Sequence, residues 1–356
     1  MRNASHLHTM NPVDNRLRHV VVTTYADGRS NLRGIPIVKR KNHVASVLEI
    51  TGRAPKQEVL VYEFRKAVSV RENLWSRYIA KTGERYYPIE SITEHLFTRI
   101  GQTLHLNMAE TKLSIIRGQL RLLSKVFVPS RRFQLIHGAE ILTAHLDGDK
   151  EFVQEIVRGQ KKLASSIVFV DDIIEAIQNM FPNHYNPLVE GLLQTLLFDA
   201  WSGCLDRHLY NWGVIRDVTD RLPPAFAPIY DSARGLYWRH TDRDLRDHLG
   251  DRGKAKRSKY IDDSCPELGA KGQVRKCNHF DIARRIIALC DSPSHTWASQ
   301  TKNWLCTTFT DDARNLVCRM IENEFGIMLS PVRIKAIQQT IIDRHEKFSQ
   351  ILKEFK

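Results

Sequence analysis

Residues 206–211 read DRHLYN, and Asp231 follows twenty positions after Asn211. An aspartate and an asparagine thus stand five positions apart, and a second aspartate comes after a short run of β-like residues. This layout is typical of a phosphoryl-transfer site, where one aspartate faces the attacking hydroxyl and the other two side chains hold Mg²⁺ against nucleotide phosphates. We therefore predict that Asp206 faces the acceptor hydroxyl and that Asn211 and Asp231 ligate magnesium.

The residues on either side of this stretch predict how the ligands would meet. Apolar residues at helical spacing over 188–201 predict a helix that ends just before Asp206, which then lies on a loop. Residues 212–215 and 227–230 predict two short strands separated by a turn. A two-stranded ribbon of this kind would present both metal ligands at adjacent strand ends.

The N-terminal half contains candidate phosphate-binding residues. Residues 50–57, ITGRAPKQ, combine a glycine turn, a hydroxyl and a lysine before a predicted strand over 59–64. Backbone N–H groups of such a turn can cradle phosphates, although a single glycine before a strand is more often a plain turn. A second strand over 74–80 ends at Lys81, where a kinase places its α/β-phosphate clamp. The alternative is an ordinary solvated lysine at a strand end.

Two interpretations of Glu94 remain open from the sequence. Apolar residues at helical spacing predict a helix in the residues after Pro88. If Ser91 begins this helix, Ser91 and Glu94 form a capping box that satisfies backbone N–H groups. If the helix begins earlier, at Pro88, Glu94 can point at Lys81 and fix it for catalysis.

The distribution of predicted elements indicates an α+β chain with a division near residue 137. Alternating residues over 113–116 and 120–128 predict a hairpin that continues the sheet, and 133–136 predict one more strand. The remaining pattern is mostly helical. We divide the chain into a polar arm (1–35), a small N-terminal lobe with an antiparallel sheet and one helix (36–137), and a larger, mainly helical C-terminal lobe (138–356).

The composition of the chain limits which partners and which cellular location we expect. The 356 residues carry a formal net charge of +13, which favours an acidic partner or merely solubility. There is no run of about 18 apolar residues that would span a membrane, and the N-terminus lacks the apolar core of a secretory signal. Six scattered cysteines without a CxxC pair are typical of free thiols, so we expect a cytoplasmic protein.

A basic stretch follows the second aspartate. Residues 234–259 contain nine lysines or arginines and four aspartates, and no period is visible over 239–278. Three interpretations remain open: a solvated loop, a loop ordered by substrate or by phosphorylation, and a basic surface for nucleic acid.

The stretch LDRHLYNWGV at 205–214, together with APIYD at 227–231, resembles the catalytic core of HipA-like kinases. The resemblance extends to TGRAPK at 51–56, which is similar to the phosphate loop of that family, and to YIAK at 78–81, which is similar to its ATP-clamping strand. It implies a two-lobed protein-kinase-like fold with ATP and Mg²⁺ as cofactors. The site residues that it implies are Asp206 as catalytic base or hydroxyl-orienting residue, Asn211 and Asp231 as Mg²⁺ ligands, Lys81 as phosphate clamp, Glu94 as the helix-borne glutamate, and Thr51, Gly52 and Lys56 in the phosphate loop.

Two further residues gain roles from resemblance. The pattern D-R-H-x-x-N also resembles a lipid-kinase motif, in which the histidine lies near the transferring phosphate. His208 is therefore a candidate catalytic residue, and a structural histidine packed under the loop is the alternative. Autophosphorylation in the phosphate loop is common in HipA-like kinases, and Thr51 is the matching hydroxyl.

The resemblance implies a protein serine/threonine kinase, and in several family members a toxin of a toxin–antitoxin pair that modifies an aminoacyl-tRNA synthetase. We therefore expect a protein substrate, an antitoxin partner, contact with nucleic acid through the basic surface, and no membrane span. Two alternatives remain. One is a phosphoinositide or small-molecule kinase on the same fold, and the other is a non-catalytic module that binds nucleic acid or an antitoxin.

Overall fold

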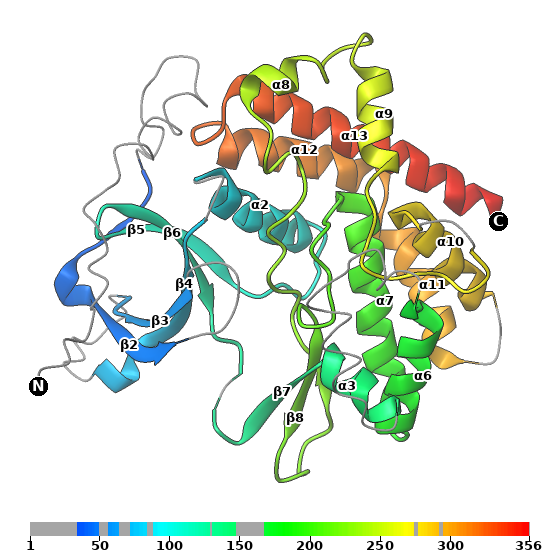
Figure 1. Ribbon diagram of the computed structural model, residues 1–356, viewed down its shortest axis with the longest axis horizontal. Coiled ribbons are helices and arrows are strands. Elements are labelled where there is room, and N and C mark those ends of the chain that lie inside the picture. Colours follow the sequence, from blue (N-terminus) through cyan, green and yellow to red (C-terminus); the bar gives the residue numbers. More distant parts are fainter. Residues whose placement is uncertain are drawn as a thin grey trace, which may run out of the picture.

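The computed structural model describes residues 34–49, 56–63, 72–83, 88–128, 130–146, 167–273, 277–291 and 295–355. A curled sheet from the N-terminal part and a group of helices from the C-terminal part lie side by side, and helix α2 lies between them (Figure 1). This arrangement is the two-lobed α+β fold that the sequence predicts. Most of the predicted polar arm, and the phosphate-loop residues 50–55, lie outside the described residues.

The sheet of the N-terminal lobe has six strands in the order β1-β5-β6-β4-β3-β2. The strands are β1 (Ile37–Val38), β2 (His43–Glu49), β3 (Lys56–Val61), β4 (Ser76–Lys81), β5 (Thr111–Ile116) and β6 (Gln119–Lys125), and 3₁₀ turns η1 (Arg40–Asn42) and η2 (Glu72–Leu74) precede β2 and β4. Neighbouring strands pair antiparallel, except that β1 runs parallel to β5. The predicted hairpin forms as β5 and β6 because Arg117 and Gly118 take positive φ values of 52° and 77°, as a two-residue hairpin turn requires.

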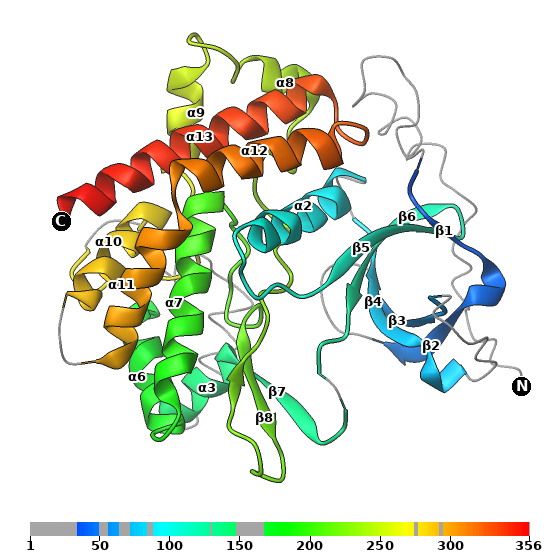
Figure 2. The same ribbon diagram turned by 180° about the vertical axis from the view of Figure 1, so that it is seen from behind.

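Side chains alternate between the two faces of this sheet. One face, which carries Val59 and Leu123, buries a small apolar cluster. The other face, which carries Leu122, packs against α2 (Ile89–Thr103) and is continuous with the core of the C-terminal lobe. Helix α2 also packs against α12 (Asp311–Phe325), which lies along it in Figure 2. Helix α2 therefore contributes to both lobes.

A second, three-stranded sheet lies beside residues 206–211, the predicted catalytic stretch. Its strands, in spatial order, are β7 (Phe133–His137), β8 (Gly213–Asp217) and β9 (Ala225–Phe226). The strand predicted over 133–136 therefore pairs with β8 and does not continue the N-terminal sheet. The strand predicted over 227–230 is displaced to β9, because Pro228 has no N–H to donate to a ladder. Ile229 instead forms a parallel bridge with Met108 of the N-terminal lobe.

The C-terminal lobe consists of helices around a large apolar core. They are α3 (Gly138–His145), α6 (Val170–Met180), α7 (Tyr185–Ser202), α10 (His279–Cys290), α11 (Thr296–Thr308), α12 and α13 (Pro331–Glu354). Helix α7 is central, since it contacts α6, α10, α11 and α13 (Figure 1). Helix α13 begins at Pro331, because Ser330 caps it and the proline occupies the first helical turn. Within the described residues, no helix is long and apolar enough to cross a membrane.

Two short helices, α8 (Asp242–Arg246) and α9 (Lys254–Asp262), occupy the region where the sequence shows no period. Helix α8 buries only Leu245, and α9 buries only two residues, Arg257 and Ile261. With so few buried positions, the sequence of these helices shows no apolar residues at helical spacing. Both helices contact α13, so tertiary packing stabilises them.

Candidate active site

The predicted catalytic stretch, residues 206–211, forms a tight loop between α7 and β8. Helix α7 ends at Gly203, whose φ of 85° lets the chain leave the helix in the left-handed conformation. The backbone N–H of His208 donates to the Asp206 carbonyl at 3.1 Å, and the N–H of Asn211 donates to the His208 carbonyl at 2.8 Å. The Asn211 side chain folds back, and its Nδ2 donates to the Asp206 carbonyl at 2.6 Å. The loop thereby fixes Asp206 and Asn211 relative to each other.

Arg207 joins this loop to the segment that carries the second aspartate. Its side chain is buried, and its guanidinium donates two hydrogen bonds to the Asp199 carboxylate, at 2.9 and 3.1 Å. It donates three more, to the carbonyls of Asn211 (2.7 Å) and Tyr230 (2.9 Å) and to the Ser232 hydroxyl (2.8 Å). One buried cation therefore sets the spacing between the two predicted metal-binding segments.

Asp231 lies where two lysines of the N-terminal lobe converge. Its Oδ1 is 2.9 Å from Lys81 Nζ, and its Oδ2 is 2.9 Å from Lys56 Nζ. Its φ of 55° is in the left-handed region, a strained conformation for a residue other than glycine that often marks functional sites. The Asn211 Nδ2 lies 3.4 Å from the Asp231 carbonyl, so the two predicted ligands adjoin.

Lys81 also contacts Glu94, and the start of α2 explains why. The helix begins at Ile89 after Pro88, with no side-chain cap, so the capping-box interpretation of Glu94 is wrong. Glu94 Oε1 instead lies 2.5 Å from Lys81 Nζ. Ser91 Oγ accepts a hydrogen bond from a backbone N–H of the β4–α2 loop at 3.2 Å. The ion pair expected from the second interpretation is present.

Burial and ion pairing shift the pKa values of these groups in opposing directions. Burial alone would raise the pKa of Asp231, but Lys81 and Lys56 outweigh it and hold that pKa well below its usual range. Burial alone would lower the pKa of Lys81, but Asp231 and Glu94 together raise it. Burial also raises the pKa of Glu94, against the opposing effect of Lys81. Two ammonium groups thus face two carboxyl groups, and Asp231 stays ionised.

Backbone hydrogen bonds tie the Asp231 segment to the N-terminal lobe. The N–H of Ile229 donates to the Asn107 carbonyl at 2.8 Å, and the N–H of Ala109 donates to the Ile229 carbonyl at 2.9 Å. Asn107 and Ala109 lie between α2 and β5. The segment that carries the predicted metal ligand is therefore bonded to both lobes.

The residues after Asp231 return to the catalytic loop. Arg234 Nη1 lies 3.2 Å from Asp206 Oδ1. At Gly235, with φ of 151°, an added Cβ would lie 2.4 Å from the Gly203 carbonyl oxygen and 2.5 Å from the Phe97 ring. Only glycine fits this approach between the C-terminal end of α7 and α2.

The structure describes only some of the remaining predicted site residues. His208 is half-buried, and its Nδ1 accepts the backbone N–H of Tyr210 at 3.2 Å, which orients the ring within the loop. Its role near a phosphate stays a prediction. Thr51 and Gly52 lie outside the described residues. Lys56 lies within the described residues, and its Nζ contacts the carboxylate of Asp231, a predicted metal ligand.

Sequence reasoning missed the buried arginines that hold the site together. Arg344 of α13 donates to the carbonyls of Ala200, at 3.1 and 2.5 Å, and Trp201, at 3.3 Å. These carbonyls lie at the C-terminal end of α7, where a cation is favourable. Arg344 is 144 residues from Ala200, so no local pattern marks it. For Arg207 the sequence does contain a signal, because this arginine lies between the end of a predicted helix and a predicted metal ligand.

The side chains present fit a magnesium-bound nucleotide. Carboxylate and amide oxygens are ligands that Mg²⁺ prefers. Asp231 is ionised, and the nitrogen of the Asn211 amide is engaged by the Asp206 carbonyl, so the amide oxygen is the atom suited to a cation. Lys56 and Lys81 supply positive charge beside the same point, as nucleotide phosphates require.

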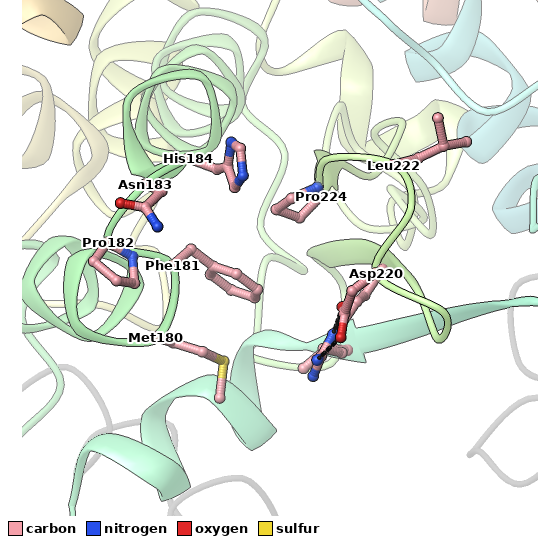
Figure 3. A pocket seen from close by; sticks show the side chains of 10 residues that line it. Met180, Phe181, Pro182, Asn183, His184, Asp220, Leu222 and Pro224 are labelled. Carbon is pink, nitrogen blue, oxygen red and sulfur yellow. Dashed lines mark hydrogen bonds and ion pairs between the residues drawn. The ribbon is translucent and has the colours of Figure 1, made fainter.

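A pocket of about 270 Å³ lies elsewhere, between the α6–α7 turn and the three-stranded sheet (Figure 3). Its lining includes Met180, Phe181 and His184, and the ion pair of Arg216 with Asp220, whose two hydrogen bonds measure 3.0 Å. None of the residues that line it is a predicted site residue. We assign this pocket no part in the chemistry.

Comparisons with known proteins show the family and the fold of this chain. A family model described as HipA-like C-terminal domain matches residues 48–297, which include every predicted site residue. No curated protein matches the chain. The structure is similar to that of the Helicobacter pylori proinflammatory kinase CtkA, with a TM-score of 0.65, 16% identity, and coverage of 90% of this chain and 98% of CtkA. It is also similar to HipA of Shewanella oneidensis MR-1, solved in complex with HipB and operator DNA. The TM-score is 0.52 and the identity 15%, and the match covers 86% of this chain and 66% of HipA.

Proposed function

The chain belongs to the HipA-like C-terminal domain family, and on that premise we propose that it is an ATP- and Mg²⁺-dependent protein serine/threonine kinase. The observation that carries the proposal is the convergence of Lys81, Glu94 and Asp231 within ion-pair distance, with Asn211 beside them. Asp206 lies on the adjoining loop. A clamp lysine with its glutamate, two metal ligands and an acceptor-facing aspartate are the parts that a protein kinase uses.

In this proposal each side chain has one task. The Asp206 carboxylate orients the acceptor hydroxyl and takes its proton as the hydroxyl oxygen bonds to the γ-phosphorus and the bond to ADP breaks. Arg234, at 3.2 Å, holds that carboxylate in place. Lys81, held by Glu94, binds phosphate oxygens. Bound Mg²⁺ would neutralise charge on the phosphates, and Asn211 and Asp231 would hold it.

The lysine contacts of Asp231 imply a rearrangement on nucleotide binding. Both lysines now contact the carboxylate that we propose as a metal ligand. Nucleotide phosphates offer these lysines an alternative anion, and the freed carboxylate can then take the metal. We propose that Lys56 and Lys81 move from Asp231 to the phosphates in this way.

We also propose a protein acceptor and a toxin–antitoxin context. The similar HipA structure contains HipB and operator DNA, which supports an antitoxin partner and contact with nucleic acid by analogy. An aminoacyl-tRNA synthetase as acceptor, and autophosphorylation at Thr51, belong to the same proposal.

Transfer of labelled phosphate tests the proposal. The protein is incubated with Mg²⁺, γ-labelled ATP, protein acceptors and, separately, phosphoinositide vesicles. We expect label on protein, and a loss of about 10²- to 10³-fold in Asp206→Asn and Asp231→Asn, the scale of losing one charge-stabilising group. Asp312→Asn, an exposed aspartate on α12, is the matched control and should retain activity. Transfer to lipid alone would favour the lipid-kinase alternative, and no transfer by the wild type would contradict the proposal.

A further inference from the structure

Helices α8 and α9 and the loops around them carry a dense group of exposed cations, which we call the α8–α9 surface. Its cations are Arg239, Arg243, Arg246, Arg252, Lys254, Lys256 and Lys259. Between Arg239 and Lys259 the exposed carboxylates are fewer: Asp244, Asp247 and Asp251. The proposed catalytic roles use none of these side chains.

Most of these cations form no direct ion pair in the part of the chain that the structure describes. Lys256 Nζ contacts an Asp247 carboxylate oxygen at 2.7 Å. The other six form no ion pair with a described residue. Such a concentration of unpaired positive charge attracts an external anion and speeds its association.

The backbone beneath the α8–α9 surface is held by buried contacts. Arg257 is buried, and its Nη1 donates to the carbonyls of His248 (2.6 Å) and Gly250 (2.9 Å). Its Nε donates to Asp343 of α13 at 2.8 Å. The surface is therefore preorganised, which lowers the entropy cost of binding a partner.

A short segment connects this surface to the aspartate that we propose faces the acceptor. Arg234 contacts Asp206 at 3.2 Å, and its guanidinium lies 5.6 Å from the centre of the Trp238 ring. Arg239, the first exposed cation, follows five residues after Arg234, and five residues span at most about 18 Å. An extended acceptor with its hydroxyl at Asp206 would reach the surface within about six residues.

We propose that the α8–α9 surface binds acidic side chains that flank the acceptor serine or threonine, so that the enzyme prefers acidic protein segments. This inference rests on the proposed kinase function and adds the substrate class. The three carboxylates among the cations favour an acidic protein over nucleic acid. A continuous phosphate backbone would meet them as repulsive contacts, whereas separate Asp or Glu side chains can pair with individual cations.

Phosphorylation of matched peptides tests the inference. One serine peptide carries four glutamates near the serine, a second carries four glutamines, and a third carries four lysines. Wild type is compared with Arg243→Glu/Lys254→Glu. Both side chains are exposed, and Lys254→Glu places a glutamate in the first turn of α9, where an acidic residue is favourable, so folding is expected to be retained. Lys41→Glu/Arg221→Glu, which reverses two exposed cations outside the α8–α9 surface, is the matched control.

We expect wild type to favour the acidic peptide over the neutral one by about tenfold in kcat/KM at low salt, with the difference mostly in KM. The α8–α9 variant should lose that preference and keep its activity on the neutral peptide, and the control variant should keep both. Equal rates on all three peptides would overturn the inference while leaving the kinase proposal intact. No transfer by the wild type would overturn both.

Binding of labelled peptide and of a labelled DNA duplex, measured by fluorescence anisotropy, gives a second test that does not require activity. We expect the α8–α9 variant to lose affinity for the acidic peptide by about tenfold. If the variant loses affinity for DNA alone, the surface is a nucleic-acid site and the acidic-acceptor inference is wrong.

Discussion

Arg207→Met is the substitution whose cost the structure defines best. The side chain is buried, and the substitution removes five hydrogen bonds, two of them to the Asp199 carboxylate. Burial raises the pKa of Asp199, and Arg207 opposes that rise. Without Arg207, a buried carboxyl group loses its cation, and such losses cost about 3–5 kcal/mol of unfolding free energy.

The assay is chemical denaturation of wild type, Arg207→Met, Asp199→Asn and the double variant. We expect each single variant to lose several kcal/mol of unfolding free energy. The double variant should lose less than the sum of the two single losses, because the partners belong to one buried pair. Arg221→Met, at an exposed arginine, is the control and should stay within about 0.5 kcal/mol of wild type. A cost below about 1 kcal/mol for Arg207→Met, or strict additivity in the double variant, would refute the reasoning.

Two further predictions concern the N-terminal lobe. Lys81→Ala removes the cation between the buried carboxyl groups of Glu94 and Asp231, so both nucleotide affinity and stability should fall. The double variant Lys81→Ala/Glu94→Gln should recover stability but not nucleotide affinity. Recovery of both would contradict the role of Lys81 as the phosphate clamp. Burial lowers the pKa of His95 to about 4 from 6.5, with help from Arg99. The folded state therefore binds fewer protons than the unfolded chain, so stability is full above pH 6.5 and falls by about 3 kcal/mol as the pH drops to about 4. His95→Gln should flatten this decline in urea denaturation curves recorded across that window, and an unchanged slope would contradict the assignment.

The parts of the site that the sequence predicts are those with a local pattern. The spacing of Asp206, Asn211 and Asp231 predicts a loop followed by a ribbon, and the structure contains both, with the second strand displaced by Pro228. Lys81 is predicted at a strand end and lies at the end of β4. These features depend on side-chain spacing over short stretches of the chain, which a sequence displays directly.

The parts that the sequence leaves open depend on contacts between distant residues. The role of Glu94 is decided by where α2 begins, and Ile89, the first residue of that helix, is buried in the core that both lobes share. Lys56 meets Asp231 across 175 residues, and no spacing rule connects them. Helices α8 and α9 form because α13 supports them, although their own sequence shows almost no buried stripe. Tertiary contacts override local preference in each case.

The Mg²⁺ dependence of nucleotide affinity tests the central claim most directly. Titration calorimetry with a non-hydrolysable ATP analogue, with and without Mg²⁺, compares wild type with Asp206→Asn and Asp231→Asn. We predict that Mg²⁺ raises affinity at least tenfold, or about 1.4 kcal/mol, in wild type and Asp206→Asn, and that Asp231→Asn loses this gain. Without Mg²⁺, Asp231→Asn should bind at least as well as wild type, because Lys56 and Lys81 are released to the phosphates. A full Mg²⁺ gain in Asp231→Asn would contradict the claim that Asp231 holds the metal.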